Sequence, residues 1–162
     1  LFAVDDLTIT PFPVLHDANE PVGFTIVRGP TRIGIATDLG MVTDAVREHL
    51  RPCEVIVLEA NHDPELLRSS RRPRRLVQRI LGRQGHLSND GAAEALASLA
   101  SPTLRHVYLA HLSAECNTGR RALRAVAEAL SKRGLSHVRV ELTYPDRVSA
   151  VWCAEVAADN RL

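Results

Sequence analysis

The sequence predicts an α/β protein in which helices pack on one or both faces of a mixed β-sheet. Three observations indicate this class. Short apolar runs separated by turn residues open the chain as a hairpin, strand-like and helix-like segments then alternate, and Gly or Pro marks most of the boundaries. This alternation is typical of layered α/β domains, which bury a sheet under helices.

The opening part of the chain supplies most of the predicted strands. His16-Asp17 ends the first strand, the turn-rich residues 28–31 separate the next two, and Pro52 ends the first helix. Apolar side chains recur at helical spacing in that helix, and the run after it has the continuous apolar character of a buried strand. We therefore expect strands at residues 7–15, 24–27 and 33–36, a helix at 41–50 and a strand at 55–58.

The rest of the chain alternates helices with strands. Ser88 or Asn89 caps one of these helices and Pro102 stops it. Gly134 stands at the left-handed C-cap position of the most regular helix, whose apolar stripe is Leu123, Val126, Ala127 and Leu130. We expect helices at residues 64–69, 73–81, 89–100 and 118–133, a turn at 82–85, and strands at 107–110, 138–142 and 148–152.

Length and composition describe one globular domain, expected to span residues 1–162. With 45% hydrophobic and 24% charged residues the chain is not disordered, and no apolar run approaches the roughly 20 residues of a membrane helix. A formal net charge of +1 excludes a globally basic nucleic-acid binder, so any contact with a polyanion needs a local patch.

The cysteines bear on the cellular compartment of the protein, and the first residues bear on whether the chain is part of a longer protein. Cys53, Cys116 and Cys153 are too far apart in sequence to indicate a disulfide framework or a metal-binding pair, so we expect buried free thiols in the reducing cytoplasm. The chain opens with Leu1-Phe2-Ala3, without an initiator Met or a signal peptide, and we expect it to be cut from something longer.

Polar side chains that can bind metals follow four of the predicted strands. They are His16-Asp17, Asp38, the group Glu59-Asn61-His62-Asp63, and His111. Functional residues of α/β sheets gather beyond the carboxyl ends of strands, and imidazole and carboxylate groups bind zinc, manganese and iron. Each residue alone is better explained as a helix cap or a packed histidine, but four coincidences of position together favour a metal site.

Two further sequence patterns indicate sites that could bind anions. The turn at residues 85–89 leads into a helix, where backbone N–H groups attract phosphate, although a plain N-cap explains it as well. In the segment 68–83, four arginines spaced by three or four residues are expected to share one helical face beside Leu76, Val77, Ile80 and Leu81, and no acidic residue within the segment offsets them. Because no aromatic residue is interleaved, we expect contact with a phosphate backbone and no base stacking; the alternative is a solvated face.

These residues stand in motifs that resemble the metallo-β-lactamase-fold hydrolases and, within them, the bacterial YycJ/WalJ type, which is described as DNA exonucleases. The resemblance covers nearly the whole chain, about residues 7–151. Its motifs are PVLHDA at 13–18, EPVGF at 20–24, TDLG at 37–40, EANHD at 59–63, GHLSN at 85–89 and LAHLS at 109–113. The fold that it implies is an αββα sandwich with two metal ions at one edge.

The resemblance also implies roles for individual residues. His16 and His111 match histidine ligands, and Asp38 matches the catalytic aspartate that bridges two divalent ions, zinc or manganese. Contact with the substrate phosphate, or support of the ligands from behind, is implied for Asn61, His62, Asp63, His86, Ser88, Asn89 and Asn117.

One departure from the family pattern is large. The principal metal motif, His-x-His-x-Asp-His, does not occur, and we expect it upstream of Leu1 with the first strands of the fold. The sandwich would then be incomplete at its N-terminus, with this chain as its C-terminal two-thirds. Smaller departures are Cys116, where an Asn-Asn pair is common, and Arg72, where an aromatic residue is common.

The complete protein is therefore expected to hydrolyse phosphodiester bonds, as a DNA exonuclease whose nucleophile is a hydroxide bridging two metal ions. The arginines expected to hold the DNA backbone are Arg72, Arg75, Arg79 and Arg83. The alternatives are a metallo-hydrolase of a cyclic phosphodiester, thioester or lactone, a non-catalytic nucleic-acid-binding fragment, and a piece that folds poorly because a sheet edge is exposed. No membrane partner is expected, and the sequence leaves the metal and the oligomeric state open.

Overall fold

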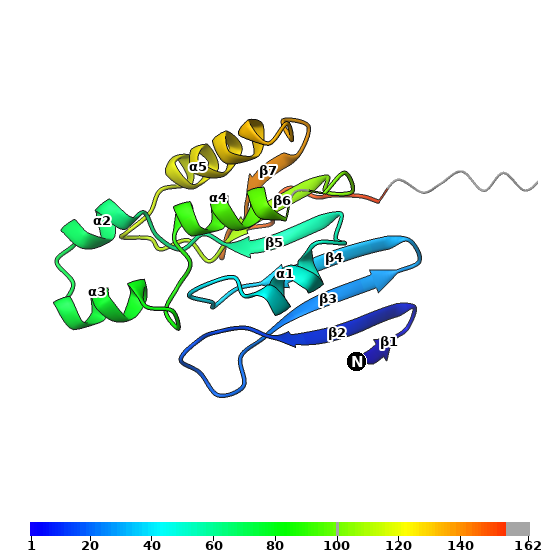
Figure 1. Ribbon diagram of the computed structural model, residues 1–162, viewed down its shortest axis with the longest axis horizontal. Helices are drawn as coiled ribbons and strands as arrows, with labels where there is room; N and C mark the ends of the chain where they lie inside the picture. The colour runs from blue at the N-terminus through cyan, green and yellow to red at the C-terminus, as the bar shows by residue number, and fades with distance from the viewer. Residues whose placement is uncertain (100, 155–162) are drawn as a thin grey trace, which may run out of the picture.

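The computed structural model describes residues 1–99 and 101–154, which build one mixed sheet of seven strands in sequence order. The first four strands are antiparallel and the last four, β4 to β7, are parallel, as the hairpin and the later alternation predict (Figure 1). The strands are β1 (Phe2–Val4), β2 (Leu7–Pro13), β3 (Val22–Arg28), β4 (Thr31–Ala36), β5 (Val55–Glu59), β6 (His106–Ala110) and β7 (Arg139–Leu142).

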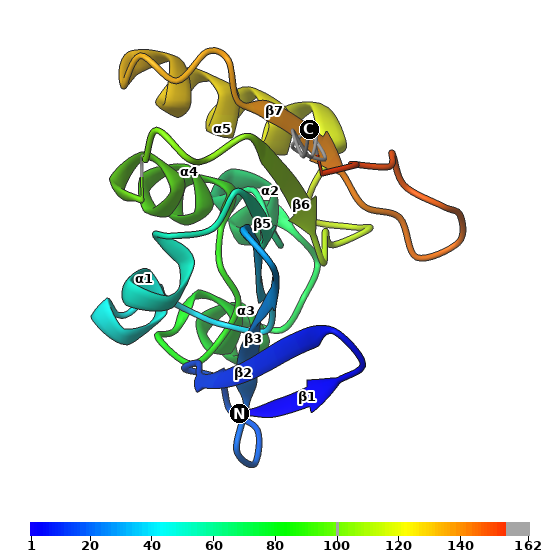
Figure 2. The same ribbon diagram turned by 90° about the vertical axis from the view of Figure 1, so that its right-hand side faces the viewer.

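The helices fall into two groups. Three of them, α1, α4 and α5, cover one face of the sheet, whereas α2 and α3 lie beyond the edge at which β4, β5 and β6 end (Figures 1 and 2). We call this the carboxyl edge. The helices are α1 (Asp44–Leu50), α2 (Pro64–Ser69), α3 (Arg74–Leu81), α4 (Asn89–Ser98) and α5 (Gly119–Lys132).

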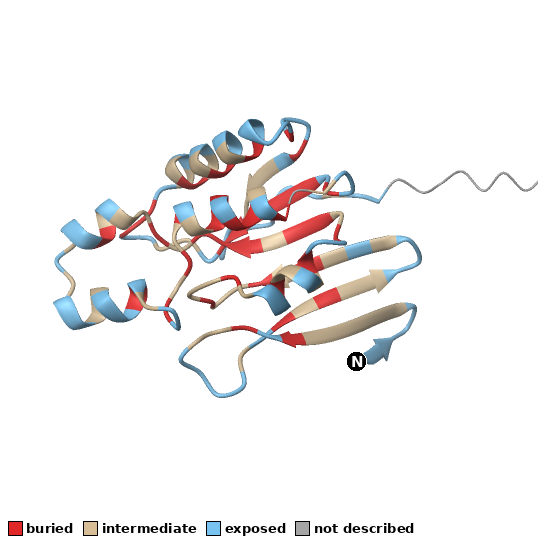
Figure 3. Cartoon of the chain, viewed as in Figure 1, coloured by how far each residue is buried: buried red, intermediate tan, exposed pale blue. Residues whose placement is uncertain are grey.

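The core lies between the sheet and its three covering helices (Figure 3). Side chains alternate between the two faces along each strand, and Gly34 faces α1, because a Cβ there would collide with Leu50. The register places Ile56 and Val107 on the same face, and both are buried. Burying such side chains stabilises the fold by about 1.5–3 kcal/mol each.

The opposite face of β2 to β5 is apolar but only partly buried. Its side chains alternate with those of the core, and we call this surface the bare face: Ile9, Phe24, Ile26, Ile33, Ile35 and Val57. The segment that follows β7 covers the neighbouring part of the sheet, where Tyr108 Oη donates a hydrogen bond to Ala150 O at 2.8 Å. No helix among the described residues packs on the bare face (Figure 2).

Most predicted elements are confirmed, and the exceptions have local reasons. The predicted strand at 148–152 is wrong: Val148 and Val151 are exposed and the segment has no strand partner. The three-residue strand β1 is too short to carry a periodic signal and was not expected. The first helix begins three residues later than predicted because Thr43 Oγ1 caps it by accepting from Val46 N.

Smaller corrections concern side chains. Ala127 is exposed although the predicted stripe included it, and Leu81 is exposed in α3. Cys53 and Cys116 are buried as expected, but Cys153 is exposed. Among the described residues, no helix combines the length and the apolar character that crossing a bilayer requires.

Candidate metal centre

The carboxyl edge brings together five imidazole and carboxylate side chains from five separate segments. His16 follows β2, Asp38 follows β4, Glu59 ends β5, His86 precedes α4 and His111 follows β6. We call them the histidine–carboxylate cluster. Two overlapping groups within it, His16–Asp38–His86 and Glu59–His86–His111, each bring three potential ligand atoms within 4.8 Å of one another.

Asp38 lies at the centre of the three histidines. Its Oδ1 is 3.5 Å from His111 Nδ1, 3.8 Å from His16 Nε2 and 3.9 Å from His86 Nδ1. The Asp38 side chain is 47% exposed, so this oxygen is accessible from solvent.

Glu59 lies beneath the cluster and is fully buried. Its Oε1 is 2.7 Å from His86 Nδ1 and 2.9 Å from His111 Nδ1, and its Oε2 accepts a hydrogen bond from Leu39 N at 2.9 Å. Burial raises the pKa of a carboxyl group, but these hydrogen bonds outweigh it and leave the pKa of Glu59 below its ordinary value. The same contact raises the pKa of His111, against the opposing effect of burial.

The arrangement around Glu59 orients two imidazole rings. A carboxylate that accepts from Nδ1 fixes the tautomer and leaves Nε2 as the free ligand atom. Histidines that bind metals in proteins are commonly held in this way. His16 is oriented by a different partner, because its Nδ1 lies 3.0 Å from Gly85 O.

Two members of the cluster have a strained backbone. Asp38 has φ of 54° and His111 has φ of 58°, in the left-handed region that residues other than Gly seldom adopt. Asn61 Nδ2 donates to His111 O at 2.8 Å, and this contact holds the turn at His111. Such strain persists only where the surrounding contacts impose it, and it is concentrated at functional sites.

Behind the cluster, buried amides connect the ends of β5 and β6 with α4 and α5. Asn89 and Asn117 are hydrogen bonded to each other, and Asn117 Nδ2 also donates to Ala60 O at 2.8 Å. Both asparagines are less than 10% exposed. Of the two roles predicted for them, support of the site therefore fits their contacts better than contact with a substrate.

Asp63 and Ser88 begin the helices next to the cluster. Asp63 Oδ1 accepts from Glu65 N and Leu66 N at 3.0 Å, and its Oδ2 pairs with Arg121 Nη1 at 2.8 Å. Burial opposes ionisation of Asp63, but the bond from Arg121 and those from the helix lower its pKa. Ser88 Oγ accepts from Gly91 N at 3.0 Å, so Ser88 is the N-cap of α4.

His62 is the one remaining predicted residue of this group. It is 1% exposed, and neither of its ring nitrogens has a hydrogen-bond partner among the described residues. Burial lowers its pKa, so its ring is neutral at pH 7. Its carbonyl accepts from Asn89 N at 2.8 Å and thereby ties the start of α2 to that of α4.

The four arginines predicted to line one helical face without acidic partners do not form such a row. Arg72 Nη2 pairs with Glu115 Oε2 at 3.0 Å, and Arg79 pairs with Asp17, which lowers the pKa of that carboxyl. Arg83 lies beyond the end of α3, with its Nε 3.2 Å from Met41 Sδ. Arg75 is exposed and has no ion-pair partner among the residues that the structure describes.

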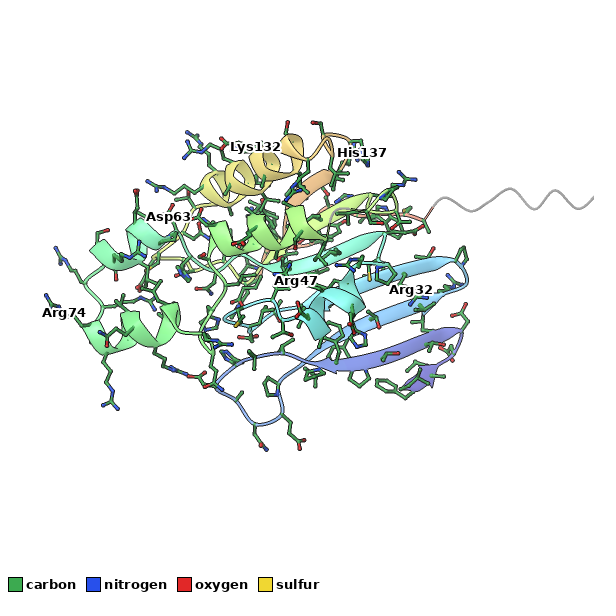
Figure 4. The ribbon with its side chains drawn as sticks, in the orientation of Figure 1. Arg32, Arg47, Asp63, Arg74, Lys132 and His137 are labelled. Atoms are coloured by element: carbon green, nitrogen blue, oxygen red, sulfur yellow. The ribbon has the colours of Figure 1, made fainter. Side chains whose placement is uncertain are left out.

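The acidic partners come from distant segments, which a search within residues 68–83 could not find. Figure 4 shows Arg74 on the outer side of α3, away from the sheet. The sequence pattern predicted no specific role for Glu59, and it placed His86 among the residues that contact the substrate phosphate or support the ligands. A glutamate at the end of an otherwise apolar buried strand was the available signal, because burying a carboxylate is costly unless it has partners.

The sequence agrees with this geometry. The family model of the Beta-lactamase superfamily domain matches residues 2–112, which include the whole histidine–carboxylate cluster. The chain belongs to the beta-lactamase superfamily. The predicted resemblance and the predicted α/β metallo-β-lactamase fold are thereby confirmed.

Curated relatives of this superfamily member include two nucleases. The chain is 35% identical to exodeoxyribonuclease YycJ of Bacillus anthracis over 129 residues, which cover 80% of this chain and 49% of the relative. It is 38% identical to exodeoxyribonuclease WalJ of Streptococcus pneumoniae over 112 residues, 69% of this chain and 42% of the relative. The chain thus spans about half the length of these relatives.

Solved structures agree on the fold. The metallo-β-lactamase fold protein YhfI from Bacillus subtilis has a TM-score of 0.62 at 14% identity, over 88% of this chain and 48% of its own. The short form of human tRNase Z has a TM-score of 0.51 at 18% identity, over 70% of this chain and 39% of its own.

Proposed function

We propose that this chain carries part of the metal centre of a phosphodiester hydrolase that is a DNA exonuclease in its complete form. The observation that carries the proposal is the gathering of three histidines and two carboxylates in two overlapping groups at the carboxyl edge, with Asp38 exposed and Glu59 buried beneath them. The names of the two curated relatives support DNA as the substrate.

The residues present fit divalent metal ions. The donor set combines imidazoles with an exposed carboxylate, which suits zinc or manganese, and Glu59 orients two of the rings from behind. His16, Asp38 and His111 would hold two divalent ions, and Asp38 would be the ligand common to both. When bound, two such ions supply a water acidic enough to attack phosphorus at neutral pH.

His86 is proposed to contact the substrate phosphate. Its ring lies between those of His16 and His111, with centroid distances of 5.0 and 5.1 Å. Glu59 accepts from its Nδ1, which leaves Nε2 to face a phosphate oxygen or the leaving oxygen of the ester. Hydrolysis forms one P–O bond, breaks the ester bond and moves a proton to the oxygen that leaves.

The phosphate backbone is proposed to continue into a cavity that shares His86 with the cluster. This cavity has a volume of about 360 Å³, and Arg47, Arg68 and Ser88 contribute polar groups to its walls. Arg75 and Arg83 are the members of the predicted row without an acidic partner among the described residues, so both remain available for a phosphate. A small substrate, the alternative activity, would use the same metal centre without these cations.

The bare face supports a further part of this proposal. The match covers 49% of the YycJ relative, which leaves that relative room for a second sheet, and an apolar face on β2 to β5 is the surface that such a sheet would bury. We propose that a segment upstream of Leu1 supplies this sheet and the remaining ligands, and that residues 1–162 are one part of a single domain. Free buried thiols at Cys53 and Cys116 suit the cytoplasm as its compartment.

The test is cleavage of a DNA oligonucleotide by the full-length protein that contains this chain, with manganese or zinc present. Asp38→Ala should reduce cleavage by about three orders of magnitude or more, because it removes the shared ligand. Glu48→Gln, which changes an exposed carboxylate on α1, should leave cleavage unchanged. Full activity of Asp38→Ala would contradict the assignment. Turnover of a lactone or thioester without cleavage of DNA would favour the alternative.

A further inference from the structure

A cavity of about 440 Å³ opens beside His111, between the end of β7 and the start of α5. It differs from the cavity with Arg47 and Arg68, because most of its walls are apolar. Leu112, Leu142 and Pro145 form these walls, and Thr37 adds a hydroxyl group close to the cluster. Gly119 leaves the space that the Leu142 side chain occupies, since a Cβ at Gly119 would collide with Leu142 Cδ1.

Tyr144 is the aromatic residue of this cavity, which we call the tyrosine cavity. Its side chain is one of the large exposed apolar groups of the molecule, with 39% of the residue accessible. The guanidinium carbon of Arg147 lies over the ring, 3.7 Å from its centroid, and Tyr144 N donates to Ser149 Oγ at 3.2 Å. An aromatic ring and a cation are therefore held together near the candidate metal centre.

This pair lies between the two segments predicted as strands, residues 138–142 and 148–152. The absence of aromatic residues among the arginines of 68–83 argued against base stacking, but the fold brings Tyr144 to His111 from a different part of the chain. Aromatic side chains stack on any base, and a neighbouring arginine adds electrostatic attraction. An apolar slot next to a phosphate site is the environment that a nucleobase requires.

We propose that the tyrosine cavity binds the nucleobase of the nucleotide that is being removed, with Tyr144 as the stacking residue and Arg147 facing the adjoining phosphate. This inference rests on the proposed function, because it needs the scissile phosphate at the histidine–carboxylate cluster. The walls offer apolar contact and few hydrogen-bonding groups, so binding should depend on the presence of a base more than on its identity.

The first experiment compares two single-stranded oligonucleotides in cleavage by the full-length protein. One is intact, and the other has an abasic tetrahydrofuran residue at the terminal position that is removed. Tyr144→Ala should raise KM for the intact strand by roughly 10-fold and leave KM for the abasic strand nearly unchanged. Tyr144→Phe should behave as the unchanged protein, and so should Phe2→Ala, which removes an exposed aromatic residue from β1.

The second experiment measures binding without turnover. An oligonucleotide with 2-aminopurine at the same position is titrated in the presence of calcium, and stacking on Tyr144 should quench its fluorescence. The unchanged protein and Tyr144→Phe should quench, and Tyr144→Ala should not.

The outcomes separate this inference from the proposed function. The base site would be overturned if Tyr144→Ala raises KM equally for both strands, or for neither strand, and leaves the fluorescence quenching unchanged. Metal-dependent cleavage by the unchanged protein would then still support the proposed function. If the unchanged protein cleaves neither strand with any divalent metal and binds no oligonucleotide, the proposed function fails and this inference fails with it.

Discussion

The histidine–carboxylate cluster and the arginine segment of residues 68–83 were both predicted to be functional, and only the first has the predicted form. The cluster draws its side chains from five separate segments that meet at one edge. The arginine segment is continuous, and two of its four singled-out arginines are paired with Asp17 and Glu115 from elsewhere. Strand ends in a parallel sheet must converge, whereas the partners of a surface helix are free to come from anywhere.

The difference shows which kind of sequence pattern predicts where a functional side chain lies in the folded protein. A residue placed at the end of a buried strand has its position set by the hydrogen-bonded ladder, so its neighbours can be predicted. A charge on an exposed helix face depends on contacts that the local pattern does not contain.

The strongest contrast is expected from Glu59, the buried member of the cluster. Glu59→Gln keeps the shape but removes the negative charge that orients His86 and His111, so metal affinity should fall by about 10- to 100-fold. Titration calorimetry with zinc or manganese on the full-length protein measures this, with Glu48→Gln as the exposed control. Unchanged affinity would show that Glu59 does not support the ligands.

The pair of Glu59 and His111 should also make stability depend on pH in the metal-free protein. The lowered pKa of Glu59 gives stability that is present above its ordinary value of 4.5 and is lost as pH falls through the lowered pKa. The raised pKa of His111 gives stability that is present below its ordinary value of 6.5 and is lost as pH rises through the raised pKa.

The contribution of the pair should therefore be greatest between pH 4.5 and 6.5. Urea denaturation in EDTA should give the largest difference between the unchanged protein and Glu59→Gln inside this window. The difference in the free energy of unfolding between the two proteins should become smaller below pH 4.5 and above pH 6.5. A difference that is the same at every pH would contradict the ionised pair.

The smaller effects belong to the arginine segment. Arg75→Ala should lower the slope of log affinity against log salt for DNA by about 1, because this free cation can replace one counterion. Removing the ion pair with Arg72→Ala and Glu115→Ala together leaves the net charge unchanged and should leave the slope unchanged. If the double variant lowers the slope as much as Arg75→Ala does, Arg72 contacts DNA despite its ion pair. That result would support the row of phosphate-binding arginines that the sequence predicted.

Much of the fold could be predicted because local rules governed it. Ser88 caps α4, and Gly134 adopts the left-handed conformation after α5, with φ of 75°. The strand predicted at 148–152 failed because its alternating pattern has no paired strand beside it, and pairing is a tertiary property. The same limit applies to the site: His16, Asp38 and His111 could be located, but the contacts of Glu59 and the place of Tyr144 depend on segments distant in sequence.

The most direct test of the metal centre is the metal content of purified protein, measured by elemental analysis. It compares this chain with a version extended upstream of Leu1, and each with its Asp38→Ala variant. The account predicts nearly two metal ions per extended chain, far fewer in residues 1–162 alone, and a clear loss on substitution of Asp38. Absence of metal from both lengths, or full retention in Asp38→Ala, would contradict it.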